Sequence, residues 1–116
     1  MKITMILFSS ILALAVVVSG AVKLRKSPQV IEGMAHVGVT ETQVPMLAGL
    51  EILGGLGLLV GFGVTIFGRL GAIGLALYFA GAVVAHVRIK DAFKVMAPAF
   101  FLFVIAVVTV GLQINR

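Results

Sequence analysis

Four long apolar segments dominate the pattern of this chain, and short stretches between them carry most of its charged residues. A hydrocarbon core about 30 Å thick is crossed by roughly 20 helical residues. We therefore expect four membrane-spanning helices, at about Ile3–Val22, Val44–Ile66, Leu70–Val87 and Phe93–Leu112. The pattern predicts an all-α membrane protein whose single domain, residues 1–116, is a four-helix transmembrane bundle.

The connectors between these spans differ in length. Only Gly68-Arg69 and its immediate neighbours separate the second span from the third, which predicts a tight helical hairpin, and residues 88–92 join the third to the fourth. The first connector alone has room for structure of its own. It contains Ser27-Pro28, a typical helix start, followed by an apolar stripe at helical spacing. We expect a short helix at about Pro28–His36, lying in the membrane interface between spans one and two.

The first span also has features of a secretory signal. Lys2 precedes a long apolar run, and Val18-Ser19-Gly20-Ala21 contains small residues of the kind found at cleavage sites. The apolar run is longer than the usual core of such a signal, and cleavage would leave an odd number of spans. We therefore expect this segment to remain as the first span.

Composition favours a membrane protein over a soluble one. The chain is 61% hydrophobic and 11% charged, whereas about a quarter of an average soluble domain is charged. A soluble fold of this size could not bury so much apolar surface. The chain has no cysteine, which excludes disulfides, dithiol–quinone exchange, thiolate metal sites and iron–sulfur clusters.

The distribution of bases predicts a lipid surface and an orientation. The formal net charge is +5, but the bases lie at the ends of apolar segments, so we expect anionic lipid headgroups as partners and no nucleic acid. Lys2, Arg69 and Arg116 fall at one end of the predicted bundle. The other end holds Lys23, Arg25, Lys26, Arg88, Lys90 and Lys94. The positive-inside rule then places the first and third connectors in the cytoplasm and both termini outside.

Acids and histidines gather at the end that is richer in bases. A carboxylate in hydrocarbon costs several kcal/mol unless it is paired, protonated or facing a wet cavity. Glu51 lies in the second span, and we expect it to pair with a cation from an adjoining segment. We predict a half-buried polar pocket in which His86 and Arg88 close over Glu51. Its residues would be Glu51, His86, Arg88, His36, Lys23 and Asp91.

Two interpretations of this cluster remain open. It would either bind a ligand or clamp the spans together through hydrogen bonds and ion pairs. Small residues predict close packing of the second and third spans, at Gly57, Gly61, Ala76 and Ala80. Such residues most often serve packing within one molecule, and a seam between identical copies is the alternative.

Four motifs follow one another along the chain. They are Ser19-Gly20 followed by Lys23, Glu32-Gly33-x-Ala35-His36-x-Gly38, Gly49-Leu50-Glu51-Ile52-Leu53-Gly54-Gly55-x-Gly57-Leu58, and Gly81-Ala82-Val83-Val84-Ala85-His86-x-Arg88-x-x-Asp91 with Pro98 beyond. Their order and spacing resemble those of the DoxX-like family of small four-span bacterial membrane proteins. The resemblance covers essentially the whole chain.

This resemblance implies a four-helix bundle in the bacterial cytoplasmic membrane. Some members of the family are linked to quinone-dependent redox chemistry, often beside a protein partner. We therefore predict a redox-linked accessory subunit that binds a quinone or a similar amphiphile among Glu51, His86, Arg88 and His36. The chain has no flavin motif or evident haem motif, so electrons would come from a partner and we do not expect an enzyme on its own.

Three other functions are weighed against this one. The leading alternative is a non-enzymatic assembly or scaffold subunit of a larger membrane complex, or a homo-oligomer. A metal or haem protein is less favoured, because the histidines and acids lack tight ligand spacing and we expect no metal site. A channel or transporter is least favoured, because the chain shows no internal repeat of the secondary-transporter kind and the polar groups do not continue to the opposite face.

Overall fold

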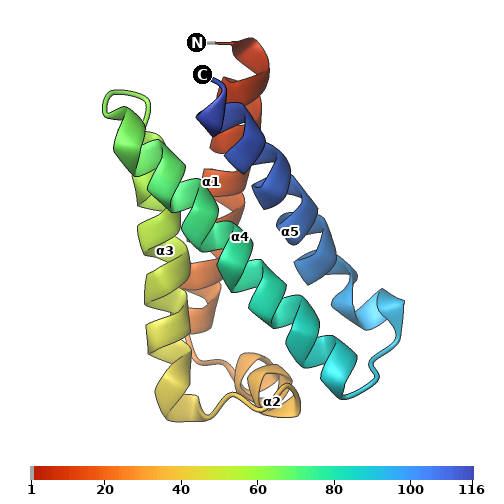
Figure 1. The fold of residues 1–116 in the computed structure, drawn as a ribbon. Coiled ribbons are helices and arrows are strands. Elements are labelled where there is room, and N and C mark those ends of the chain that lie inside the picture. The colour runs from red at the N-terminus through yellow and green to blue at the C-terminus, as the bar shows by residue number, and fades with distance from the viewer. Residues whose placement is uncertain (1) are drawn as a thin grey trace.

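The computed structural model of the protein describes residues 2–116, and its secondary structure is helical. Four of the helices are long and apolar enough to cross a membrane. The expected bundle, with a short helix between the first and second spans, is confirmed (Figure 1). The elements are α1 (Ile3–Leu24), α2 (Pro28–His36), the 3₁₀ helix η1 (Glu41–Gln43), α3 (Val44–Val60), α4 (Thr65–Arg88) and α5 (Phe93–Ile114).

The long helices run alternately up and down (Figure 1). Both termini and the α3–α4 turn lie at one end, whereas α2 and the α4–α5 connection lie at the other. Helix α3 packs against α1 and α4, and α5 packs against α4 and α1. The bases therefore divide between the two ends of the bundle as the sequence predicts.

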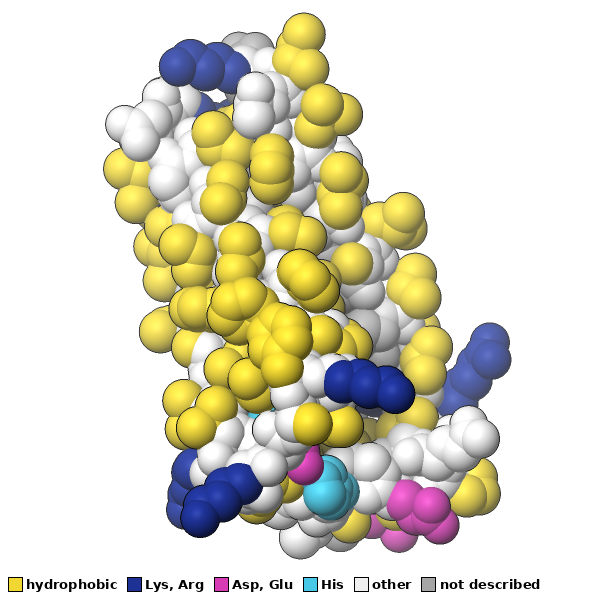
Figure 2. Space-filling model, turned by 90° about the vertical axis from the view of Figure 1, so that its right-hand side faces the viewer, with side chains coloured by type: hydrophobic (Ala, Val, Ile, Leu, Met, Phe, Trp, Pro, Cys, Tyr) yellow, Lys and Arg dark blue, Asp and Glu magenta, His cyan; other side chains and the backbone are white. Residues whose placement is uncertain are grey.

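The buried interior is small, as expected of helices that meet lipid on their outer faces. Leucine, alanine and valine side chains of α1, α3 and α4 form most of it, with single contributions from α5. Large apolar side chains are exposed along all four spans, and they cover most of the face seen in Figure 2. The buried core cluster consists of Leu12, Ala13, Val16, Leu58, Ala72, Leu75, Phe79 and Ala106.

The α3–α4 turn lies earlier in the sequence than predicted. Helix α3 ends at Val60 and α4 begins at Thr65, so the prediction of a second span reaching Ile66 and a turn at Gly68-Arg69 is wrong. The turn residues 61–64 are apolar or glycine, and hydropathy therefore does not mark them. Arg69 instead lies inside α4, where its Nε donates to the backbone carbonyl of Gln113 at 3.1 Å.

Glycines allow α3 and α4 to approach closely beside this turn. A Cβ atom at Gly61 would overlap the Cα atom of Gly68, and one at Gly57 would lie 3.2 Å from the backbone oxygen of Phe67. Both glycines of the GxxxG pair therefore face α4 of the same molecule. Ala76 and Ala80 are half-buried on α4, and Ala76 packs against the core cluster.

Helix α2 has the predicted bounds because its start is encoded locally. The Ser27 side chain accepts a hydrogen bond from the backbone N–H of Val30 at 3.4 Å, and Pro28 occupies the first turn. Such a cap satisfies a donor that the helix itself leaves free. After the helix, Gly38 has φ +86°, a conformation that glycine adopts without steric cost. The chain thereby turns toward η1 and α3.

Candidate functional site

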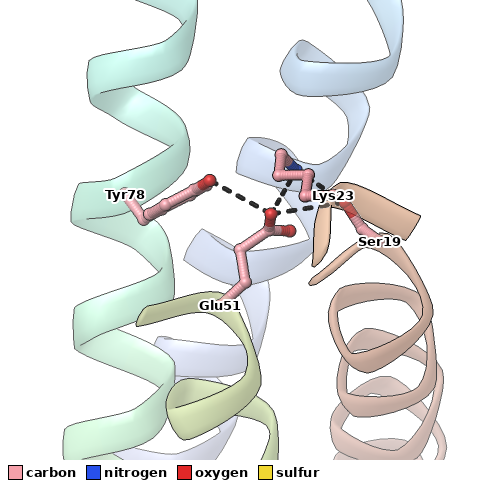
Figure 3. Close-up of polar contacts among 4 residues, drawn as sticks. All are labelled: Ser19, Lys23, Glu51 and Tyr78. Atoms are coloured by element: carbon pink, nitrogen blue, oxygen red, sulfur yellow. Dashed lines mark hydrogen bonds and ion pairs between the residues drawn. The ribbon is translucent and has the colours of Figure 1, made fainter. Parts of the chain in front are cut away.

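Glu51 is fully buried on the face of α3 that packs into the bundle. The buried positions of α3 follow a helical spacing, with Ala48, Glu51, Gly55 and Leu58 on one side. The face that carries the core residue Leu58 therefore also carries the carboxylate. Figure 3 shows the Glu51 side chain between α1 on one side and α4 on the other.

Three donors converge on one oxygen of this carboxylate. Ser19 Oγ donates to Glu51 Oε1 at 3.3 Å, and Tyr78 donates to the same atom at 3.0 Å. Lys23 Nζ also donates to Oε1 and forms an ion pair with it, while a further Lys23 bond of 2.8 Å reaches Ser19 Oγ (Figure 3). Ser19 and Lys23 are four residues apart on α1, a spacing that places both side chains on one face.

The ion pair explains how an acid is retained within a membrane span. The side chain of Lys23 is 15% exposed and that of Glu51 is fully buried. An ammonium group beside the carboxylate offsets much of the desolvation cost that either charge would carry alone. The expected pairing with a base from an adjoining span is thus present, with Lys23 as the base. We refer to Ser19, Lys23, Glu51 and Tyr78 as the Glu51 cluster.

One oxygen of Glu51 is left without a partner. Oε2 is buried and accepts no hydrogen bond from residues 2–116. A buried acceptor without a donor costs on the order of 1–3 kcal/mol. Within the described chain, the Glu51 cluster therefore provides an acceptor that a donor from another molecule would satisfy.

His86 and Arg88 do not close over Glu51 as expected. The hydrogen-bond partners of Glu51 are those of the Glu51 cluster. His86 lies eight residues beyond Tyr78, which is about 12 Å further along α4 at the helical rise. Its Nδ1 is instead 2.7 Å from Oδ2 of Asp91. The predicted single pocket is therefore replaced by two separate polar clusters.

The second cluster is centred on Asp91, in the short α4–α5 connection. His36, the last residue of α2, has its Nε2 2.8 Å from Oδ1 of Asp91. Because an ionised carboxylate only accepts hydrogen bonds, both imidazoles act as donors here. The bond from His86, followed by that from His36, holds the pKa of Asp91 below its ordinary value of 3.8, against a smaller opposing effect of burial. This Asp91 cluster connects α2 to the end of α4.

Arg88 belongs to neither cluster. Its guanidinium makes no hydrogen bond or ion pair with residues 2–116. The residue lines a groove of about 490 Å³ between the end of α2 and the end of α4. The groove is also lined by Ala35, His36, Val37, Gly38, Ala85 and Ile89.

A larger groove on the outer face of α3 and α4 leads to the Glu51 cluster. Its volume is about 750 Å³, and leucine, glycine, valine and phenylalanine residues line almost all of it. Tyr78 is the single polar residue in that lining, and the same side chain bonds to Glu51. One phenol therefore connects an apolar groove, open to the outside of the bundle, with a buried acid–base pair. We call this the α3–α4 groove.

Sequence reasoning identified Glu51 and Lys23 but not the roles of Ser19 and Tyr78. Tyr78 is the only tyrosine in the chain. A single phenol within an apolar span was the sequence signal that could have pointed to a polar role for this residue. Ser19 lies one turn before Lys23, a spacing that also pointed to a shared face. No group of three or more His, Asp or Glu side chains suitable for a metal occurs within residues 2–116.

Comparison with known proteins gives one match. The family model described as the DoxX-like family matches residues 7–108 of the 116-residue chain. This region contains the Glu51 cluster, the Asp91 cluster and both grooves. No curated protein and no solved structure matches the chain.

Proposed function

Because this chain belongs to the DoxX-like family of membrane proteins, we propose that it is a redox-linked accessory subunit that binds a quinone or a similar amphiphile. The tail would lie in the α3–α4 groove and the polar head would lie against Tyr78. The observation that carries this proposal is the double position of Tyr78, which lines the groove and donates a hydrogen bond to Glu51.

The α3–α4 groove has the chemistry of a tail site. Its wall is almost entirely aliphatic, aromatic or glycine, so an isoprenoid or acyl chain would exchange lipid contacts for protein contacts without leaving a polar group unpaired. Gly74 lines the groove, and a Cβ atom at this position would meet no other atom within 4 Å. The groove is therefore open at Gly74 and would leave room there for a branched isoprenoid chain.

The polar end of the groove fits a carbonyl or hydroxyl head. The Tyr78 oxygen has lone pairs that would accept from a hydroxyl head while its own hydrogen stays on Glu51 Oε1. For a carbonyl head, the single phenol hydrogen would leave Glu51 and turn to the carbonyl oxygen. Glu51 Oε2, buried and without a donor, would accept a second hydrogen bond once Tyr78 rotates. His86, Arg88 and His36, which the sequence suggested as head-group ligands, lie outside this arrangement and have no part in the proposal.

The cluster also provides groups that hold and move a proton. A quinone, when bound, supplies the two-electron chemistry, and a partner protein would supply the electrons. Tyr78, Glu51 and Lys23 form a continuous hydrogen-bonded row, and Lys23 is its partly exposed end. These residues would hold a proton at the Tyr78 oxygen, exclude bulk water through burial and connect the head group to the base-rich end of the bundle.

The site of action that we propose is the bacterial cytoplasmic membrane. The base-rich end, which carries α2, would face the cytoplasm, and both termini would lie outside. Lys23 belongs to the base-rich end, so the proton row would open toward the cytoplasm. Bound quinone and anionic lipid are the small-molecule partners in this proposal, together with an electron-donating protein.

A scaffold role is the second candidate, and the position of α5 favours it. Helix α5 is the least buried of the four spans, and its main contacts are with α4 and α1. Its outer side would accept a helix of a larger complex. A partner that stays bound, with its activity intact, after both the tail site and the head site are altered would favour the scaffold over the ligand site.

The proposal is tested by adding a short-tailed ubiquinone analogue and a menaquinone analogue to the purified protein in detergent, and measuring the shift in melting temperature. Gly74→Leu should abolish the shift, because the new side chain fills the α3–α4 groove. Gly81→Leu is the matched control, since Gly81 lies on the same helix with equal open space but does not line the groove.

The head group is tested in the same titration by Tyr78→Phe, which removes one hydroxyl. Thr109→Val is its control, because it removes a hydroxyl that bonds only to the Ile105 carbonyl within α5. We expect the shift to disappear in Tyr78→Phe and to persist in Thr109→Val. Equal shifts in Gly74→Leu, Tyr78→Phe and the unaltered protein would exclude this site.

A further inference from the structure

The groove between α2 and α4 is a second candidate site, independent of the α3–α4 groove. Its wall combines the end of α2 and the residues after it with Ala85, Arg88 and Ile89 from the end of α4. It lies at the base-rich end of the bundle. Figure 2 shows charged and histidine side chains gathered toward the lower end of one face, below a broad hydrophobic surface.

Arg88 gives this groove an unneutralised positive charge. The nearest acid in the connection, Asp91, is occupied on both oxygens by His36 and His86. Glu51 is likewise paired with Lys23. The remaining charged residues at this end are mostly bases. The bases are Arg25, Lys26, Arg88, Lys90 and Lys94, and the acids are Glu32 and Glu41. An anion that approaches this end therefore meets a positive potential and a guanidinium that has no hydrogen-bond or ion-pair partner among residues 2–116.

The wall of the groove suits an amphiphilic anion better than a soluble one. Val37, Ala85 and Ile89 provide apolar contacts next to the guanidinium. Basic pockets beside membrane spans bind the head groups of anionic lipids, and the planar fork of an arginine matches two oxygens of a phosphate. We propose that this groove binds the phosphate of an anionic phospholipid through Arg88, with the glycerol and first acyl carbons against Val37 and Ile89.

The Asp91 cluster has a defined part in this site. Its two hydrogen bonds join the end of α2 to the end of α4 and to the α4–α5 connection, and the two helix ends are the walls of the groove. Asp91 therefore positions the walls while its own charge is taken up by imidazole donors. It acts as a positioning residue and does not touch the lipid.

Arg88 has a competing role that the experiment must separate. It lies in the last turn of α4, where a cation interacts favourably with the partial negative charge of the helix end. That role predicts a change in stability when Arg88 is replaced and no change in lipid preference. Lipid preference is therefore the quantity to measure.

The test measures which added lipid binds to the protein after it has been purified in a neutral detergent. In such a detergent no bilayer potential acts on surface bases. Phosphatidylglycerol and phosphatidylcholine are added in equal amounts, and the bound lipid is counted by native mass spectrometry. We expect a preference for phosphatidylglycerol that falls about tenfold in Arg88→Gln, the loss of one charge-assisted contact. Arg25→Gln removes an equal charge at the same end but outside the groove, and it should keep the preference.

Two further measurements identify the source of the phosphate and provide a variant for the case in which Arg88→Gln does not fold. Glycerol phosphate, which has the head group without chains, should not displace the bound lipid at millimolar concentration. Arg88→Lys keeps the charge but loses the fork, and it should weaken the preference even if Arg88→Gln is too unstable to purify. Equal losses in Arg88→Gln and Arg25→Gln, an unchanged preference in both Arg88 variants, or displacement by glycerol phosphate would each overturn the assignment.

Each proposal can be contradicted without the other, because the variants that test them alter different residues. A quinone analogue that shifts the melting temperature of Arg88→Gln as it does the unaltered protein leaves the α3–α4 groove intact. A phosphatidylglycerol preference that survives Gly74→Leu leaves the α2–α4 groove intact.

Discussion

Tyr78 on α4 donates a hydrogen bond of 3.0 Å to Glu51 on α3, and this bond connects the outer face of the hairpin with its interior. Glu51 itself is fully buried, so a molecule in the α3–α4 groove meets the tyrosine and not the carboxylate. Because of this hydrogen bond, the phenol connects the groove to the carboxylate, which an aromatic side chain without a hydroxyl could not do. It also distinguishes Tyr78 from the neighbouring core residue Phe79, which packs edge-on against it.

The Lys23–Glu51 pair should behave as a coupled unit. Lys23→Met leaves a buried carboxylate without its cation and should lower the free energy of unfolding by about 3–5 kcal/mol. Adding Glu51→Gln to that variant should recover a substantial part of the loss, since no buried charge then remains. Reversible unfolding in mixed micelles measures both. Additive losses in the double variant would mean that the two charges do not interact.

Close packing beside the α3–α4 turn should be sensitive to one methyl group. Gly61→Ala places a Cβ against the Gly68 backbone, which cannot rotate away as a side chain can. We expect a loss of about 1–3 kcal/mol in unfolding free energy, the usual cost of overpacking. Gly63→Ala is the control, because its nearest neighbour is the Val60 oxygen at 3.8 Å. Similar stabilities for the two variants would contradict the contact seen here.

The Asp91 cluster should lose its effect at low pH. The pKa of Asp91 is lowered in the folded protein by its histidine bonds, so its contribution to stability is complete above 3.8, the ordinary value. That contribution disappears as pH falls through the lower folded value. Melting curves between about pH 6 and about pH 3 should therefore converge for the unaltered protein and Asp91→Asn. A constant gap across this window would contradict the prediction.

Ser9 and Gln113 form a buried polar pair at the opposite end of the bundle from α2. Gln113 Nε2 donates to Ser9 Oγ at 3.0 Å, and both side chains are fully buried. Gln113→Leu should cost about 1–3 kcal/mol, because it leaves Ser9 without this donor. Ser9→Ala should recover part of that loss when it is added to Gln113→Leu. Thermal unfolding of the two single variants and the double variant measures the coupling.

The sequence predicted the features whose cause is local. Ser27 and Pro28 determine where α2 begins, and the apolar length of each span determines how many helices cross. The α3–α4 turn is not marked in the sequence because its residues are apolar, and Arg69, the base that follows them, marks a position inside α4 instead. A carboxylate in a membrane span is costly unless it is paired, protonated or facing a wet cavity. The pairing of Glu51 was predictable because several bases lie near it in the adjoining segments.

The identity of the residues that bond to Glu51 was harder to predict than the fact that Glu51 is paired. Which face of α4 meets α3 depends on how the helices rotate against each other, and hydrophobic periodicity is weak when every face is apolar. Tyr78 rather than His86 therefore came to lie beside Glu51. Asp91 gathers the two histidines because the short connection folds back toward α2, a tertiary effect that the local sequence does not reveal.

Gly61 and Gly68 let the two backbones of the hairpin touch beside the turn, with no side chain between them. The helices have no room to approach more closely there, whereas Tyr78 lies ten residues beyond Gly68, in the middle of α4. A bulky ring that reaches the Glu51 cluster would therefore displace the phenol or move the helices apart away from the turn. The glycine contact would in this way leave the geometry of the turn unchanged while the middle of the hairpin adapts to molecules of different width.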